Sequence, residues 1–180
     1  MVLKGKLVKL RKIKMADALR FVKWLNDKEV NKFTTRRKIS LAKEKKWIRE
    51  MPKHWQTDRI FAIVTISDIH IGSIGLHKID QRDKNASYAI IIGDKNYWQK
   101  GYGTDASRLI LDYGFNVLKL HRIYLRVYDY NKRAIKVYQN LGFKLEGKER
   151  EQNFYNNKFH DVFMMGLLKN EWQKARRKLR

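Results

Sequence analysis

Apolar residues recur every three to four positions in two early segments of the chain, which is the spacing of a helix face. The first segment covers residues 15–25 and predicts a helix. Its expected apolar stripe consists of Met15, Ala18, Leu19, Val22 and Leu25. The second predicted helix begins after Ser40, a residue type that caps helix starts, and runs through Glu50, where Pro52 closes it. A polar stretch at residues 34–38 separates the two helices.

Runs of β-branched and aromatic residues are typical of strands, and about seven such runs occur. They are 3–10, 59–66, 69–79, 88–93, 122–128, 143–153 and 159–167. Further helices are expected after Gly103 and after Asn131, and Asn170 is expected to cap a last helix that runs to Arg180. This order predicts one mixed α/β (α+β) domain over residues 1–180, with a mostly antiparallel twisted sheet flanked by helices.

A pair of glycines lies between a predicted strand and a predicted helix in the middle of the chain. The apolar run 88–93 is followed by the turn-rich residues 94–100, by Gly101 and Gly103, and then by a helical pattern. Glycines let the backbone approach a ligand, and the first N–H groups of a helix have no helical partner and attract phosphate. A lone Gly-x-Gly pair more often makes only a turn, and neither a dinucleotide fingerprint nor a P-loop is completed. The stretch is a candidate phosphate site, with Lys100 adding positive charge.

The charge of the chain and its last strand bear on partners. Lysine and arginine number 41 against 18 acidic residues, a net charge of +23. A field of this sign attracts polyanions, among them nucleic acid, the ribosome and phosphorylated cofactors, and slows a polycationic substrate. A basic proteome or a heat-adapted surface explains the same composition, so both interpretations stay open. An exposed final strand is able to pair two chains, so a homodimer also stays open.

The residue types present exclude several chemistries. The chain has no cysteine, which excludes disulfides, thiolate zinc sites and a cysteine nucleophile. Its five histidines lack the spacing of metal ligands, so no metal is expected. No apolar run approaches the roughly 20 residues that span a bilayer, and the first residues lack the core of a signal peptide. These features predict a cytoplasmic protein without a membrane partner.

Four sequence blocks occur in order in the second half of the chain. They are YWQKGYGTDA at 97–106, NKRAIKVY at 131–138, LGF at 141–143, and FYNNKFHD at 154–161 with MGL at 165–167. Each block is weak alone, but together they resemble the GNAT superfamily of acyl-CoA-dependent N-acyltransferases. Within it, the chain most resembles the branch of ribosomal-protein N-terminal acetyltransferases and spermidine N-acetyltransferases. The likeness extends from Ala86 to Trp172, and Trp24–Asp27 also resembles that branch.

The resemblance implies a GNAT-like fold in which two neighbouring strands part and hold acyl-CoA, with acetyl-CoA as the acyl donor. The strand backbone at Ile90, Ile91 and Ile92 would hydrogen-bond the pantetheine arm. Asn131 would bond the cofactor near the start of the following helix. The loop that would cradle the pyrophosphate through its N–H groups consists of Trp98, Gln99, Lys100, Gly101, Tyr102, Gly103 and Thr104.

In the family's reaction a neutral amine attacks the thioester carbonyl directly, and a tyrosine gives a proton to the departing CoA thiolate. The resemblance assigns this role to Tyr138. By pattern alone, Tyr138 shares an apolar stripe with Ala134 and Leu141, which is typical of a core residue. The resemblance therefore carries the catalytic assignment. Neither a metal nor a covalent enzyme intermediate is needed.

The chain departs from the family pattern at two positions. Trp98 stands where the family loop often begins with Arg or Gln, which removes a polar contact but leaves the backbone groups. Ser87 stands where many relatives have a glutamate that deprotonates the amine, so the base is open. Candidate bases, each also typical of a solvated charge, are Glu149, Glu151 and Asp161. Candidates for the wall of the acceptor site, each also typical of the core, are Trp24, Phe33 and Trp47.

Three functions fit these observations. The first is an acetyl-CoA-dependent N-acetyltransferase whose primary-amine acceptor is the N-terminus of a protein or peptide. The alternative acceptor is a polyamine or other small amine, a branch expected to line its acceptor site with acids, whereas residues 26–37 supply only Asp27 and Glu29. The third is a GNAT-fold protein that binds CoA or RNA without efficient catalysis, which the missing strand glutamate motivates. The sequence fixes neither the acceptor nor the length of the acyl group.

Overall fold

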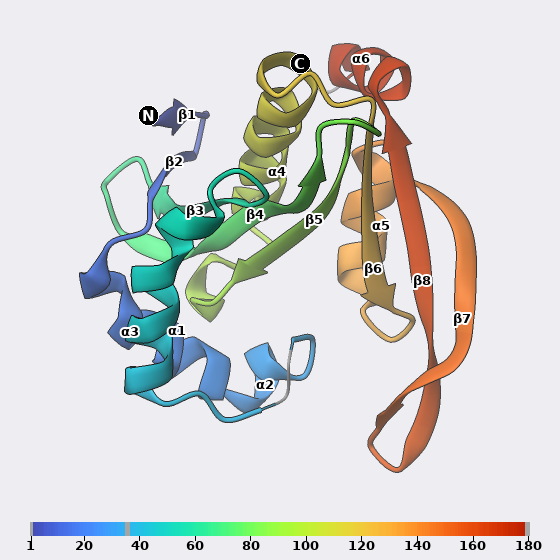
Figure 1. Ribbon diagram of the computed structural model, residues 1–180. Coiled ribbons are helices and arrows are strands. Elements are labelled where there is room, and N and C mark those ends of the chain that lie inside the picture. Colours follow the sequence, from blue (N-terminus) through green and yellow to red (C-terminus); the bar gives the residue numbers. More distant parts are fainter. Residues whose placement is uncertain (1, 35–36, 179–180) are drawn as a thin grey trace. The chain divides into compact units, whose positions relative to one another are not determined.

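The computed structural model describes residues 2–34 and 37–178 and contains two compact units (Figure 1). The first unit consists of Met1–Ile79 and Ala89–Ile110, and the second of Asp80–Tyr88 and Leu111–Arg180. Two parts of the predicted pattern, Thr35–Arg36 of the polar stretch and Leu179–Arg180 of the last helix, lie outside the described residues.

The strands of the first unit pair in sequence order. They are β1 (Leu3–Lys4), β2 (Val8–Lys12), β3 (Arg59–Thr65), nearly all of β4 (His70–Asp80) and the later half of β5 (Asn85–Ile92). The pairs β1–β2, β2–β3 and β3–β4 are all antiparallel. Ile63 of β3 pairs with Gly72 of β4, and the next pair along skips Ile71. Ile71 is therefore the extra residue of a β-bulge.

The single strand expected over residues 3–10 is wrong, because the chain turns between β1 and β2. The N–H of Gly5 donates to the carbonyl of Val8 at 2.8 Å across this turn. The carboxylate of Asp105 accepts the N–H groups of Leu7 and Val8 at 2.8 and 3.1 Å. These bonds to a distant residue hold the turn, and they bring the number of strands in the described residues to eight.

The helices of the first unit are α1 (Ala18–Asn26), α2 (Lys28–Asn31), α3 (Leu41–Glu50) and all but the last two residues of α4 (Tyr102–Asp112). The predicted cap of α3 is confirmed, since the Ser40 hydroxyl accepts the N–H of Lys43 at 3.3 Å. The stripe predicted for α1 is confirmed at Ala18, which is buried, and at Leu25, which packs against the core, but it is wrong at Leu19, which is 66% exposed. The core cluster consists of Ala18, Phe21, Trp24, Val30 and Ile48. The helix turns its large rings inward because they bury more apolar area than Leu19 would, so Trp24 is a core residue.

The second unit contains the early half of β5, β6 (Arg122–Tyr128), β7 (Lys144–Tyr155) and β8 (Lys158–Leu168). β5 pairs with β6 in parallel over Asn85–Ser87 and Arg122–Tyr124, and passes into the first unit after Tyr88. The parting of these two strands beyond that pairing stays a prediction. β8 pairs antiparallel with both β6 and β7. The predicted mixed α/β fold with a mostly antiparallel sheet is confirmed.

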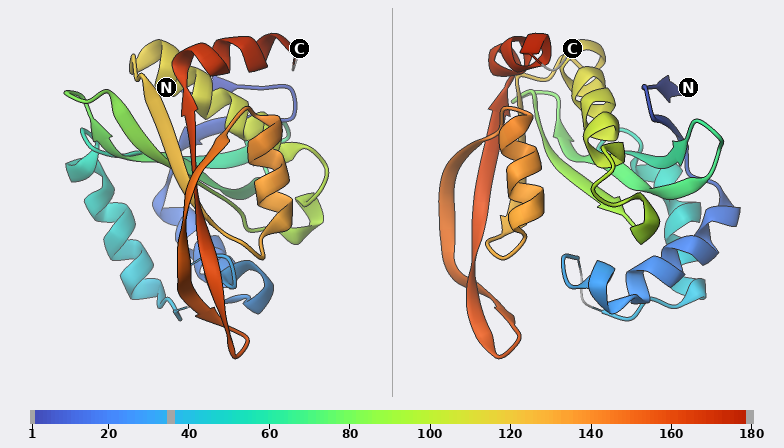
Figure 2. Two further views of the ribbon diagram at one scale, coloured as in Figure 1. Left: turned by 90° about the vertical axis from the view of Figure 1, so that its right-hand side faces the viewer. Right: turned by 180° about the vertical axis from the view of Figure 1, so that it is seen from behind.

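β7 and β8 form a long hairpin that extends beyond the start of α5 (Lys132–Asn140), as Figure 2 shows. The predicted turn at Asn156 and Asn157 is confirmed, with φ of +52° and +56°. Asn170 does not cap the last helix, because α6 (Lys169–Lys178) already includes it. The carboxylate of Glu171 instead accepts the N–H of Leu168 at 3.0 Å and satisfies the helix start.

Across residues 2–34 and 37–178, none of the helices is both long and apolar enough to cross a membrane.

Candidate active site

The end of β5 and the start of α4 lie against each other in the first unit. The predicted pantetheine-binding residues, Ile90–Ile92, are the last three of the strand. A Cβ placed on Gly103 would lie 3.6 Å from the Cγ1 of Ile92 and 3.8 Å from the Cδ1 of Ile90, which are ordinary contact distances. The structure therefore brings together the strand and the loop that the sequence analysis assigns to the cofactor.

The loop between β5 and α4 contains two positions with positive φ, Gln99 at +59° and Gly101 at +84°. Glycine adopts this conformation without strain, whereas other residues do so rarely. The carbonyl of Gly101 accepts the N–H of Asp105 at 2.9 Å, a helical bond that begins α4. Exposed positions of the loop are Gln99, Lys100 and Gly101, and half-buried positions are Trp98, Tyr102, Gly103 and Thr104.

The first turn of α4 has the properties of an anion-binding helix start. Tyr102, Gly103 and Thr104 are the first residues of the helix. Their N–H groups therefore have no helical carbonyl four residues earlier to bond. The helix dipole adds partial positive charge at this end. The acid of this turn, Asp105, is buried and bonded to the backbone of β2. Asp105 therefore fixes the helix start in place, while the loop keeps its positive character.

Two close contacts fix the end of β5. The carbonyl oxygen of Ile91 lies against Gly72, where a Cβ would be only 2.1 Å from it. The carbonyl of Ile92 accepts the indole N–H of Trp98 at 2.7 Å. A pantetheine hydrogen bond to the Ile92 carbonyl would therefore share that oxygen with the indole.

Tyr138 lies in the second unit, on α5, and its side chain is only 9% exposed. Its ring meets Tyr88 edge-on at 5.7 Å and Phe143 at 5.9 Å. Burial raises the pKa of the Tyr138 phenol well above its usual value. The phenol is therefore fully protonated at neutral pH, as a proton donor must be.

Asn131 is the N-cap of α5, and its side-chain oxygen accepts the N–H of Ala134 at 3.3 Å. The capping role alone explains an asparagine at this position. Since the side-chain oxygen caps the helix, the predicted bond to the cofactor would be donated by the side-chain amide nitrogen.

The candidate bases all lie on the β7–β8 hairpin, in the second unit. Glu149 forms an ion pair with Arg126. Asp161 accepts the N–H of Glu151 and the ammonium of Lys148, both at 2.9 Å, and these bonds lower the pKa of Asp161. A carboxylate with a lowered pKa is a weaker base. The structure therefore favours neither Glu149 nor Asp161, and Glu151 is an exposed acid.

The only two acids of the segment 26–37 hold an internal cation. The ammonium of Lys95 lies 2.9 Å from a carboxylate oxygen of Asp27 and 2.6 Å from one of Glu29. The bond from Lys95 is the main reason that the pKa of Asp27 is lowered. Asp27 also caps α2 through the N–H of Glu29. The pair is already neutralised in part by the protein's own lysine.

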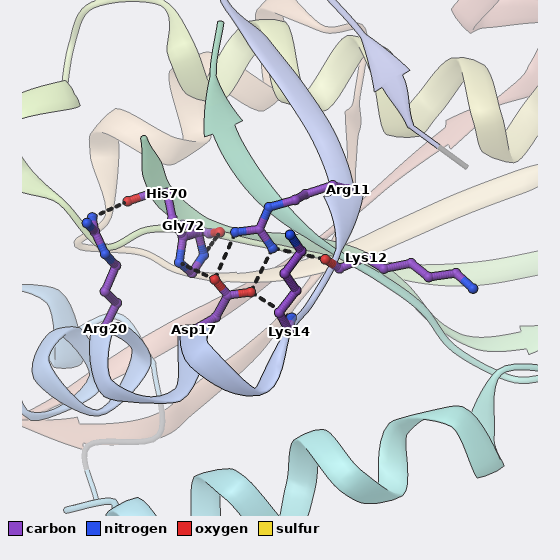
Figure 3. Close-up of polar contacts among 7 residues, drawn as sticks. All are labelled: Arg11, Lys12, Lys14, Asp17, Arg20, His70 and Gly72. Carbon is purple, nitrogen blue, oxygen red and sulfur yellow. Dashed lines mark hydrogen bonds and ion pairs between the residues drawn. The ribbon is translucent and has the colours of Figure 1, made fainter. Parts of the chain in front are cut away.

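A buried polar cluster that the sequence analysis missed joins β2, the residues before α1 and β4 (Figure 3). Asp17 accepts two bonds from the Arg11 guanidinium, at 2.7 and 2.8 Å, and one from the N–H of Lys14 at 2.7 Å, and it also lies against His70. One ring nitrogen of His70 lies 3.0 Å from the carbonyl of Gly72, and the other lies 3.3 Å from Asp17. Burial lowers the pKa of His70 to about 4. Since Gly72 supports Ile91, the cluster underlies the strand of the candidate cofactor site.

The described residues contain no group of three or more His, Asp or Glu side chains arranged to hold a metal. What they offer is a strand end, a glycine turn at a helix start and a protonated tyrosine. The mixed fold and these features, each described within its own unit, are those that the sequence resemblance predicts for the class of acyl-CoA-dependent transferases.

Comparison with known proteins identifies the family. A family model described as an acetyltransferase (GNAT) domain matches residues 8–144. The chain therefore belongs to the GNAT acetyltransferase family. It is an acetyl-CoA-dependent N-acetyltransferase with acetyl-CoA as co-substrate and an amine as acceptor.

Three similar proteins bear on the acceptor. The uncharacterized N-acetyltransferase p20 of Bacillus licheniformis is 33% identical and covers 91% of this chain and 93% of its own length. The spermidine N(1)-acetyltransferase of Escherichia coli K12 is 31% identical over 92% of this chain and 88% of its own. The crystal structure of a Vibrio cholerae spermidine N-acetyltransferase with CoA and spermine matches 92% of this chain and 98% of its own, at 26% identity and a TM-score of 0.83.

Proposed function

We propose that the acceptor is a primary amine of a small polyamine such as spermidine. The observation that carries this proposal is the match to a spermidine N(1)-acetyltransferase over nine-tenths of both chains. It favours the alternative acceptor of the sequence analysis over the peptide N-terminus. We further propose that residues 1–180 act as one catalytic domain in the cytoplasm.

A peptide or protein N-terminus is the second candidate acceptor, and two observations favour it. The net charge of +23 opposes the approach of a polycation. The acids Asp27 and Glu29 are occupied by Lys95. A peptide whose positive charge is only its N-terminal amine carries less charge than spermidine, so both obstacles weigh less on it.

In the proposed reaction, the backbone at Ile90–Ile92 holds the pantetheine arm and the N–H groups of residues 98–104 hold the pyrophosphate. Asn131 bonds the cofactor through its side-chain amide. The amine nitrogen forms a bond to the acetyl carbon, the carbon–sulfur bond breaks, and Tyr138 donates its proton to the sulfur. The raised pKa of Tyr138 makes its phenolate a strong base. The phenolate therefore regains a proton readily before the next turnover.

The proposed reaction has no dedicated carboxylate base. Ser87 occupies the strand position, and Glu149 and Asp161 are held in ion pairs. The amine is therefore proposed to enter in its neutral form and to lose its second proton to water. The rate at limiting amine should rise with pH until the amine is fully deprotonated.

Two further partners are proposed from the sequence. The positive charge supports contact with nucleic acid or the ribosome, and a steep salt dependence of RNA binding would test it. The many exposed residues of β7 support a homodimer, which light scattering would test.

The first experiment is calorimetric titration with acetyl-CoA and desulfo-CoA, followed by a thiol-release assay. The acceptor panel contains spermidine, spermine and peptides with free N-termini. Release with polyamines supports the proposal, and release with peptides alone promotes the second candidate. Turnover of neither class would refute both acceptors.

A further inference from the structure

Trp98 joins the two segments assigned to the cofactor. Its indole N–H donates to the carbonyl of Ile92 at 2.7 Å, near the short end of the range for such bonds. Ile92 is the last residue of β5, and Trp98 is the first residue of the loop. The bond therefore closes a ring around the five-residue connection, residues 93–97, between the strand and the loop.

The connection is anchored on its other side to the helices of the first unit. Trp98 and Ile91 both pack against the core cluster that contains Phe21 and Trp24. Gly93 lies directly under the Trp24 ring, where a Cβ would be 2.1 Å from a ring atom. The same connection is also held from β4, since the carbonyl of Ile71 accepts the N–H groups of Gly93 and Asp94 at 2.9 and 3.2 Å.

These contacts give the tryptophan a role that its position in the family pattern does not suggest. An Arg or Gln at this position would be a polar group for a ligand. The indole has one donor and no acceptor, and that donor is used within the protein. The ring is half-buried against the helices. Trp98 is therefore built to hold the backbone rather than the ligand.

We propose that Trp98 is a positioning residue for acetyl-CoA, whose indole fixes the end of β5 and the start of the loop in the geometry that binds the cofactor. The inference rests on the proposed cofactor site. Preorganised backbone groups bind a ligand without the cost of ordering them. Releasing the Ile92 carbonyl should therefore weaken both halves of the cofactor together.

The test uses Trp98→Phe, which keeps an aromatic ring and removes the N–H donor. Trp55→Phe is the matched control, because Trp55 belongs to the same unit and contacts Phe61, Lys12 and Arg59 instead of the loop. Affinities for acetyl-CoA, ADP and pantetheine are measured by calorimetry or competition. Steady-state kinetics with the best acceptor of the panel separate the KM of each substrate from kcat.

The expected result for Trp98→Phe is a loss of about five- to ten-fold in acetyl-CoA affinity, the size of one hydrogen bond. ADP and pantetheine should weaken by similar factors, while kcat and the KM of the amine stay within about two-fold of the wild type. Loss for ADP alone would identify a direct ligand contact and overturn the proposal. Unchanged affinity for all three would also overturn it.

Failure of the cofactor site itself would look different. In that case the wild-type protein would not bind acetyl-CoA, and the proposal for Trp98 would fall with it. Binding by the wild type together with an unchanged Trp98→Phe variant would refute the role of Trp98 alone.

Discussion

The cofactor loop of the first unit and the tyrosine helix of the second contribute to the proposed reaction through different parts of the chain. In the first, the working groups are backbone N–H and C=O groups of β5, the loop and the start of α4. In the second, they are two side chains of α5 and its cap: the phenol of Tyr138, which is proposed to give the proton, and the amide of Asn131, which is proposed to bond the cofactor. The first region thus acts through the position of its backbone groups, and the second through the chemical groups of its side chains.

This difference predicts where substitutions act. A backbone group survives most changes of its own side chain, but it depends on the residues that hold the chain in place, such as Gly72 beneath Ile91. A phenol has no substitute when its oxygen is removed. Variants near the loop should therefore act on stability and cofactor affinity, and variants at Tyr138 on turnover.

The largest expected effect is that of Tyr138→Phe. Removing a general acid should lower kcat by roughly 10²- to 10³-fold, while the affinity for acetyl-CoA, whose binding is proposed to rest on other residues, stays within about two-fold. The thiol-release assay and calorimetry measure the two quantities. Tyr88→Phe, in the ring that meets Tyr138 edge-on, controls for repacking of this cluster. A kcat within ten-fold of the wild type would refute the role of Tyr138 as the acid.

The next effect concerns His70, which supports the backbone-built site. Its folded pKa of about 4 lies below its ordinary value of 6.5. Burial is the main cause, and the guanidinium groups of Arg11 and Arg20 add to it against the attraction of Asp17. Above pH 6.5 the His70 ring is neutral in both the folded and the unfolded protein. Between pH 6.5 and 4 the unfolded state binds the proton and the folded state does not, so stability falls as the pH is lowered.

The expected loss is up to about 1.4 kcal/mol per pH unit, or about 3 kcal/mol over that window. Urea unfolding at several pH values measures it, with His70→Gln as the control that removes the titrating ring. The difference in stability between the two proteins should shrink between pH 6.5 and 4 and level off below pH 4. A wild-type stability with the same pH slope as His70→Gln would contradict the prediction.

The two regions also differ in how far the sequence predicts them. The elements around the loop follow from local pattern: the apolar run of β5, the glycine pair of the loop and the helical pattern of α4 are visible in residues 88–106. Tyr138 is not, because a tyrosine on an apolar helix stripe has the same pattern whether it is catalytic or core. Only the resemblance to a family separates these two cases.

What the sequence could not predict depends on contacts between distant residues. The split into β1 and β2 is fixed by Asp105, nearly one hundred positions away in the chain. The face of α1 that is buried depends on the residues that the helix packs against. The spacing of apolar residues along the helix does not identify those residues. The cluster of Asp17 and His70 likewise exists only once the strands are paired. Local pattern predicts elements, and long-range bonds decide their ends and faces.

A smaller effect is expected on stability when the close contact between Gly72 and the backbone of Ile91 is disturbed. Gly72→Ala would place a Cβ 2.1 Å from the carbonyl of Ile91, a backbone atom that side-chain rotation does not move away. Overpacking of this kind costs about 1–3 kcal/mol. Gly103→Ala is the matched variant, since its Cβ would meet Ile92 at 3.6 Å, an ordinary contact. Chemical unfolding should show a clear loss for the first and little change for the second. Equal losses would mean that the close approach at Gly72 is not maintained in solution.

The smallest expected effect is at Asn131, and it tests whether this residue both caps α5 and bonds the cofactor. As the N-cap of α5 it supports the helix that carries Tyr138, and Asn131→Ala should cost about 1 kcal/mol of stability. Asn131→Asp keeps the capping oxygen and should preserve stability. It also replaces the amide nitrogen with a negative charge, so if Asn131 bonds the cofactor, the affinity for acetyl-CoA should fall. Unfolding and calorimetry on the two variants therefore separate the cap from the ligand contact. Unchanged affinity in Asn131→Asp would leave Asn131 as a cap alone, and the cofactor site would then be built by the backbone of the first unit without a side-chain bond from α5.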